Sequence, residues 1–248
     1  MQLATSTWPE VEAYLKHSTG LIVPIGSTEQ HGPIGPIGTD FICAEVLAHG
    51  VGDSTGALVA PTISYGMAVH HMNFPGTIAL RPSTLQAIVR DVARSAHSHG
   101  FRRVLFVNGH GGNTASVQAA FYELYAELAA SSDQHSAELR LSLANWWELQ
   151  SVVDYVEKTF GNAEGSHASP SELGLAWYAH PEAVRSGVMH PQIAPGGSFF
   201  DAQDLRTRFA DGRIGSDSSL ASVELGQELH EIAVKSLAEK YLSFVQAQ

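Results

Sequence analysis

Four short apolar runs, each separated from the next by a segment with helical signals, constrain the fold of this 248-residue chain more than any other feature. The runs are Leu21 to Ile25, Ala57 to Ile63, Arg103 to Val107 and Leu139 to Trp147. Continuous apolar runs, in place of strict alternation, are typical of strands that are buried on both faces. Strands that alternate with helices in this way predict an α/β fold, with helices on both faces of a mainly parallel sheet.

Helix boundaries are marked by capping residues, glycine and proline. Gly50 is expected to end a helix that starts after Asp40, and Ser83 with Gln86 is expected to form a capping box. Residues 190–215 are rich in glycine, proline and aspartate, so we expect an irregular lid or an arm that contacts another subunit. The chain has no repeat, low-complexity segment or convincing linker, so residues 1–248 are expected to form one domain. Helices are expected over residues 8–17, 41–49, 83–99, 114–131, 148–160, 170–180 and 219–246.

The charge of the chain disfavours two classes of partner. The formal net charge is −11, and no run of lysine or arginine offsets it. Nucleic acid and anionic membrane surfaces would both be repelled. Cys43 is the single cysteine, so no disulfide can form within the chain, and its apolar neighbours predict a buried thiol. The first residues lack a signal-peptide pattern and no apolar run could span a bilayer, so we expect a cytoplasmic protein.

Three polar loops carry residues that can bind metals. Ligands of parallel sheets bind beyond the carboxyl ends of the strands, which is where these loops are expected to lie. Each residue taken alone is also an ordinary surface or core residue, and the glycines around His110 could instead cradle a phosphate, although the Lys-Ser/Thr of a P-loop is absent. Carboxylates together with imidazoles suit Zn²⁺, Mn²⁺ or Fe²⁺. The candidate ligands are Glu29, His31, Asp40, His110 and Glu172, with His167 nearby in the third loop.

At these residues the sequence resembles the creatininase (creatinine amidohydrolase) family. The resemblance covers about residues 20–180, and its first and third motifs are specific. The motifs, in family order, are Pro24-Ile25-Gly26-Ser27-Thr28-Glu29-Gln30-His31-Gly32 with Thr39-Asp40, then Phe74-Pro75-Gly76-Thr77, Asn108-Gly109-His110-Gly111-Gly112-Asn113, and a weaker match from His167 to Glu172.

The resemblance implies a binuclear metal-dependent hydrolase on a three-layer α/β/α sandwich, usually a homohexamer, that cleaves a C–N bond in a small-molecule amide. Glu29 and His110 would hold one divalent ion and His31 the other, with Asp40 bridging both. Gly112 stands where creatininase itself has a glutamate, and Glu172 is the expected replacement ligand. A sixth residue, His167, matches a histidine implicated in proton transfer, and we expect it to protonate the leaving nitrogen.

Departures from the family pattern affect the expected substrate more than the expected metals. The last motif runs His167-Ala168-Ser169 and Glu172-Leu173-Gly174, where the family has His-Ala-Gly and Glu-Thr-Ser. Creatinine is therefore not implied as the substrate. The substrate could instead be a related cyclic amide, a formamide on a pyrimidine-type biosynthetic intermediate, or a peptide. A non-catalytic metal-binding scaffold is a further alternative. A two-metal phosphoesterase is disfavoured by the acidic chain.

Candidate substrate contacts come from the glycine-rich loop around His110, which we call the glycine loop, and from a tryptophan pair. The backbone N–H groups of Gly111 and Gly112 are expected to position substrate. Trp147 is expected in the wall of the pocket as an aromatic contact. At least one tryptophan of the pair Trp146 and Trp147 is expected to pack in the core. His70 and His71, just before the Phe74 turn, are weaker candidates: one of them could face the pocket, but a solvated pair in the loop is the preferred interpretation.

Overall fold

The computed structural model describes residues 1–131 and 135–247. Its centre is a sheet with the strand order β2-β1-β3-β4, in which every neighbouring pair is parallel. The register places Leu21 beside Val104, and Val104 beside Leu141. The strands are β1 (Gly20–Ile25), β2 (Leu58–Val59), β3 (Arg103–Asn108) and β4 (Arg140–Asn145).

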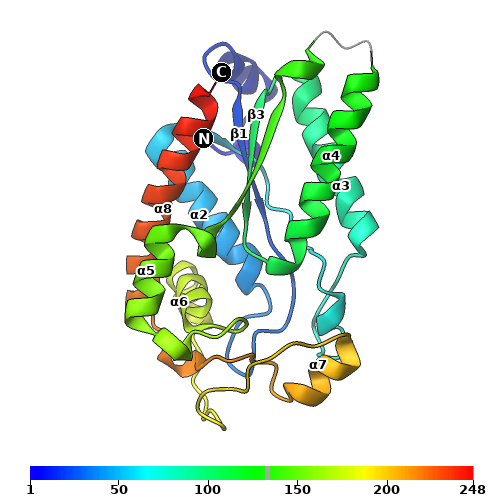
Figure 1. The fold of residues 1–248 in the computed structure, drawn as a ribbon. Coiled ribbons are helices and arrows are strands. Elements are labelled where there is room, and N and C mark those ends of the chain that lie inside the picture. Colours follow the sequence, from blue (N-terminus) through cyan, green and yellow to red (C-terminus); the bar gives the residue numbers. More distant parts are fainter. Residues whose placement is uncertain (132–134, 248) are drawn as a thin grey trace.

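Helices cover both faces of this sheet (Figure 1). On one face Val23 and Phe106 pack against α3 (Pro82–Ser98) and α4 (Thr114–Ala130), with α1 (Trp8–Leu15) beside them. On the other face Ile22 and Leu105 pack against a second group of helices. Successive residues of a strand face opposite ways, so one strand serves both cores. The expected three-layer α/β/α sandwich is confirmed, and its second layer contains α2 (Thr39–Thr55), α5 (Gln150–Thr159), α6 (Pro170–Ala179) and α8 (Val223–Gln246).

The expectation that Gly50 ends the second helix is wrong. Helix α2 continues to Thr55 and ends at Gly56, which adopts the left-handed conformation with φ of 73°. Gly50 is instead a packing residue, because a Cβ there would lie 2.6 Å from Cγ2 of Val234 in α8. The helix therefore continues through a residue that lets α8 approach closely.

Three smaller expectations are also corrected. The second apolar run forms a strand only at β2, and its end makes one isolated bridge between Ile63 and Ile25. Helix α3 has no side-chain cap, since Arg81 occupies its N-cap and Pro82 fixes its first turn, so Ser83 forms no capping box. Residues 190–215 are largely irregular, but they contain a short helix, α7 (Ala202–Arg208).

The segment 190–215, which we call the arm, is held at its base by a buried arginine. The Arg213 side chain is fully buried and donates to the carbonyl oxygens of Pro191, Gln192 and Ser216, while Asp211 balances its charge. The arm lies at the end of the molecule opposite both chain termini (Figure 1). Within the described residues, none of the helices combines the length and apolarity that a bilayer crossing requires.

Candidate metal centre

The carboxyl ends of β1 and β3 bring the predicted ligands together. Glu29 and His31 follow β1, and His110 lies two residues after β3. Asp40 lies in the first turn of α2, where its backbone carbonyl faces Gly109 so closely that a Cβ at position 109 would overlap it. This absence of a side chain lets the β3 loop rest on α2, which places His110 beside Asp40.

Two groups of potential ligands share Asp40. One group is Glu29, Asp40 and His110, and the other is His31, Asp40 and Glu172; within each group the ligand atoms lie within 4.8 Å of one another. The Nδ1 atom of His110 lies 3.2 Å from Oδ2 of Asp40, while Nε2 of His31 lies 3.0 Å from its Oδ1. The two oxygens of one carboxylate thus face two separate positions where an ion could bind.

The hydrogen bonds of the two histidines leave one nitrogen of each facing these positions. His31 Nδ1 lies 3.1 Å from the carbonyl oxygen of Glu29, and His110 Nε2 lies 3.0 Å from that of Met67. Each of these nitrogens must carry a proton, because a carbonyl oxygen only accepts, so the opposite nitrogen presents a lone pair whenever the ring is neutral, as it is when it binds a metal. Among the described residues, three buried atoms of this centre have no hydrogen-bond partner: Glu29 Oε1, His31 Nε2 and Asp40 Oδ2. Buried polar atoms are rarely left unpaired, and divalent cations would satisfy all three.

The electrostatics of the centre indicate a shortage of positive charge. Burial raises the pKa of Glu29 to about 8. Against the opposing effect of burial, Glu29 and Asp40 raise the pKa of His110 to about 9, and Asp40 with Glu172 raises the pKa of His31. The pKa of Asp40 is lowered because His31 and His110 outweigh its burial. Without cations, the centre thus retains protons at neutral pH, and bound cations would replace them.

Glu172 is held by a helix cap that leaves one of its oxygens available. Its Oε1 accepts from the backbone N–H of Ser169 at 2.7 Å, and its own N–H donates to the Ser169 hydroxyl. The other oxygen, Oε2, lies 3.8 Å from Nε2 of His31. The serine that departs from the family pattern therefore fixes the proposed ligand, and the S-x-x-E spacing of this capping box is the sequence signal for it.

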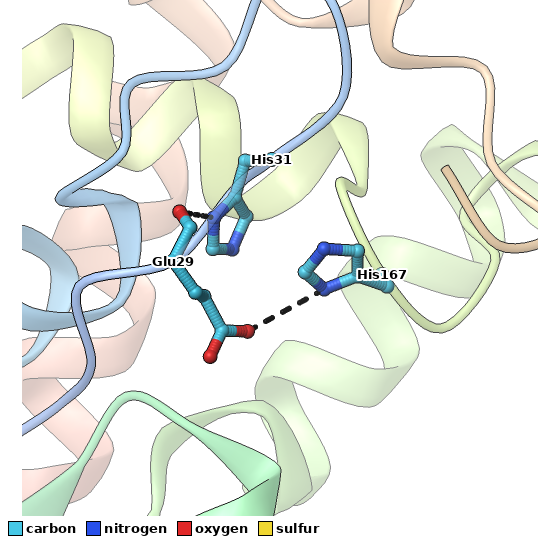
Figure 2. Close-up of side chains that lie close together, drawn as sticks. All are labelled: Glu29, His31 and His167. Atoms are coloured by element: carbon cyan, nitrogen blue, oxygen red, sulfur yellow. Dashed lines mark hydrogen bonds and ion pairs between the residues drawn. The ribbon is translucent and has the colours of Figure 1, made fainter. Parts of the chain in front are cut away.

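His167 lies beside the Glu29 carboxylate, in the loop before α6. Figure 2 shows its ring facing the Glu29 carboxylate, with Nδ1 3.8 Å from Oε1, and the His31 ring beside both. These three residues also form a group with metal-ligand spacing. Burial and the neighbouring His31 lower the pKa of His167 to about 4. His167 is therefore neutral at pH 7 unless it takes up a proton during a reaction.

His71 lies at the centre, so the preferred interpretation of His70 and His71 as a solvated pair is wrong for it, and the alternative that one of them faces the pocket holds. His71 is only 2% exposed, and its Nε2 lies 3.3 Å from Glu29 Oε1. It belongs to a short turn of 3₁₀ helix, Val69–His71, that carries no periodic signal. The one signal in the sequence is its place just before the Phe74 turn, which matches a family motif.

Comparisons with known proteins agree with this geometry. The family model described as creatinine amidohydrolase matches residues 4–241. The chain belongs to the creatininase family. It is therefore a hydrolase of that family, as expected from the sequence motifs.

Relatives within the creatininase family differ in what they act on. The chain is 42% identical over 106 residues to a mycofactocin precursor peptide peptidase of Mycolicibacterium smegmatis, a match that covers 40% of this chain and only 42% of that protein. It is 26% identical to creatinine amidohydrolase of Pseudomonas putida, over 94% of this chain and 93% of that one. A solved structure of creatininase with manganese has a TM-score of 0.86 at 24% identity and 99% coverage of both chains, which shows a shared fold.

A cavity of about 890 Å³ opens onto the centre of this creatininase-family protein. Glu29, Asp40 and His110 lie in its wall, and Gly111, Gly112 and Trp147 line it further out, where substrate contacts are expected. Trp146 also lines the cavity although it is only 2% exposed, and it makes an edge-to-face contact with Trp147. The described residues that line the cavity include five carboxylates but no lysine or arginine, so neither a phosphate cradle nor a phosphoester substrate is favoured. The carboxylates are Glu29, Asp40, Glu157, Glu164 and Glu172.

Proposed function

We propose that this protein hydrolyses the C–N bond of an amide with two divalent cations, zinc, manganese or iron, held by the two groups that share Asp40. Glu29 and His110 would hold one ion, and His31 and Glu172 the other. The observation that carries this proposal is the pair of ligand groups around one shared carboxylate, in which three buried atoms form no hydrogen bond. When bound, two such ions lower the pKa of water toward neutrality and polarise a carbonyl group.

His167 is proposed to move the proton. Its Nε2 donates to the carbonyl oxygen of Gln30 at 2.8 Å, so Nδ1, which faces the centre, begins as an acceptor. A water molecule would give one proton to Nδ1 while its oxygen bonds to the amide carbon. The C–N bond then breaks, and the leaving nitrogen takes that proton from Nδ1. The expected role of donor to the leaving nitrogen is thereby kept, but only after His167 has first accepted a proton.

The size of the cavity favours an amide larger than creatinine. A volume of about 890 Å³ lies near the upper end of the range that drug-sized ligands occupy, and a single small ring would leave most of it to water. Trp147, Val153 and Val156 form an apolar wall beside the polar centre. We therefore favour a short peptide or another open-chain amide with an apolar group, in agreement with the peptidase names of two relatives that are 42% and 36% identical over their matched parts. A third relative, 35% identical over its matched part, is named a 3-dehydro-scyllo-inosose hydrolase, so the comparisons leave other substrates open.

A substrate screen with the metal-loaded protein tests this proposal. The chain is stripped with a chelator, reloaded with Zn²⁺ or Mn²⁺, and offered creatinine, formamides of aminopyrimidines, and short peptides with apolar side chains. We expect metal-dependent release of a new amine from a peptide, and loss of both metal and activity in His31→Ala. Cleavage of creatinine or a formamide instead would overturn the substrate class, and no cleavage by protein that retains two ions would identify a non-catalytic scaffold.

Assembly and location are part of the proposal. We propose a single domain over residues 1–248 that forms a homo-oligomer, a hexamer, in the cytoplasm. The arm exposes apolar side chains that a subunit contact would cover, among them Val188 just before it and Ile193 and Phe200 within it. Sedimentation of the metal-loaded protein should give the mass of six chains, and a single-chain mass at micromolar concentration would refute the oligomer.

A further inference from the structure

Gln30 lies between two metal-ligand candidates, yet its side chain belongs to neither group. It is 5% exposed, and its amide meets three segments that are far apart in the sequence. The Nε2 atom lies 3.0 Å from His71 Nδ1, 2.9 Å from His167 Nε2 and 3.0 Å from the carbonyl oxygen of Gly212 in the arm. The Oε1 atom accepts from the N–H of Gly32 at 2.8 Å. These contacts fix which end of the amide is nitrogen, because Gly32 offers a donor and Gly212 an acceptor.

The protons around Gln30 can be assigned by counting donors. The amide nitrogen has two protons for three neighbours, and the Gly212 carbonyl takes one of them. His167 Nε2 also lies 2.8 Å from the carbonyl oxygen of Gln30, which can only accept. If His167 Nε2 carries its own proton and donates it there, the second amide proton is free to go to His71 Nδ1. This assignment gives every one of these groups a partner of the opposite kind.

We infer that Gln30 is a positioning residue that fixes the tautomers of His71 and His167, with the proton on Nε2 in both rings. His71, whose Nδ1 accepts from Gln30, then directs its N–H at Glu29 Oε1, 3.3 Å away. His167, tied through its Nε2 to the Gln30 backbone, presents the lone pair of Nδ1 to the same carboxylate (Figure 2). One residue thus orients a hydrogen-bond donor and a proton acceptor on the same side of the centre.

The arm completes this arrangement. A Cβ on Gly212 would overlap the Gln30 amide, and Gly212 adopts a φ of 88° that favours glycine. The arm backbone therefore lies directly against Gln30, and its residue Ile214 also forms an isolated antiparallel bridge with His167. The position of the Gln30 amide depends on the arm as well as on its own loop.

The tautomer assignment stands on hydrogen bonds alone, whereas the catalytic consequence rests on the proposed function, so the two are tested separately. Neutron diffraction from deuterium-exchanged crystals of the zinc-loaded wild-type protein shows the ring protons directly and needs no turnover. We expect deuterium on Nε2 and none on Nδ1 in both His71 and His167. Deuterium on Nδ1 of either ring would overturn the inference, whatever the protein hydrolyses.

Gln30→Met tests whether Gln30 is the cause. Methionine is similar in size but donates no hydrogen bond, so deuterium should spread to both nitrogens of His71 while both zinc ions stay bound. If His71 keeps deuterium on Nε2 alone, Gln30 does not set its tautomer. On the amide that the screen identifies, kcat should fall about 10–100-fold, as is typical for residues that orient ligands, with KM unchanged. Gln118→Met, an exposed residue of α4, is the matched control and should leave kcat unchanged.

Discussion

Asp40→Ala should remove both metal ions, whereas loss of any other proposed ligand should weaken one ion more than the other. Asp40 is the one residue that the groups Glu29, Asp40, His110 and His31, Asp40, Glu172 have in common. A four-ligand zinc site contributes about 10–16 kcal/mol of binding free energy, or about 2.5–4 kcal/mol for each ligand. At about 1.4 kcal/mol for each factor of ten, Asp40→Ala should weaken both ions about 10²–10³-fold.

The assay is metal content at a controlled free zinc concentration. Protein stripped with a chelator is dialysed at ten times the wild-type Kd, and zinc per chain is measured by mass spectrometry. Wild-type protein should hold nearly two ions, and Asp40→Ala about a tenth or less of the wild-type amount. Glu172→Gln, which leaves the other group intact, should retain close to one ion. Near-wild-type zinc in Asp40→Ala, or loss of one ion only, would refute the shared-carboxylate arrangement.

Three further predictions concern Glu29, His167 and Gly109. In the metal-free protein the pKa of Glu29 lies at about 8, above its ordinary 4.5, so the folded state binds more protons and its unfolding free energy should fall as pH rises from about 4.5 to 8. Urea unfolding should show this slope flattened in Glu29→Gln, and an equal slope would contradict it. His167→Ala should retain both ions by mass spectrometry and lose about 10²–10⁴-fold in kcat, and metal loss would instead make it a ligand. Gly109→Ala should lower the unfolding free energy by about 1–3 kcal/mol or more, because its Cβ would overlap the Asp40 carbonyl, and it should also weaken metal binding. The control is Gly56→Ala, which lies in open space at positive φ. It should lower the unfolding free energy by about 1 kcal/mol and leave metal binding unchanged.

The layers of the fold and the convergence of the ligand loops could be predicted from the sequence for two physical reasons. Runs such as Val104 to Val107 are apolar throughout, which requires burial on both faces and hence helices on both sides. Parallel strands end at the same edge, so the residues that follow β1 and β3 had to converge there. The structure brings Glu29, His31, Asp40 and His110 to that edge, and their role as ligands stays a prediction.

Features that depend on contacts between distant segments could not be predicted. Gln30 meets Gly212 across 182 positions of sequence, and no local pattern announces that contact. His71 is buried because it lies against Gln30 and the arm packs on its turn, whereas the sequence of that turn has no periodic pattern that predicts burial. The role of Gly50 could not be predicted for a related reason, because it packs against Val234 of α8, nearly two hundred residues later in the chain.

The tryptophan pair after β4 connects the core to the wall of the cavity. Both side chains line the cavity from the same short turn, but Trp146 is buried in the core that supports the sheet, whereas Trp147 is only partly buried against that core. The proposed metal ligands and His167 come from other loops. Substitutions at the partly exposed side of this wall can therefore change which substrates the proposed hydrolase accepts, without altering the core or the proposed metal ligands. This arrangement would allow related proteins with the same fold to evolve different substrates.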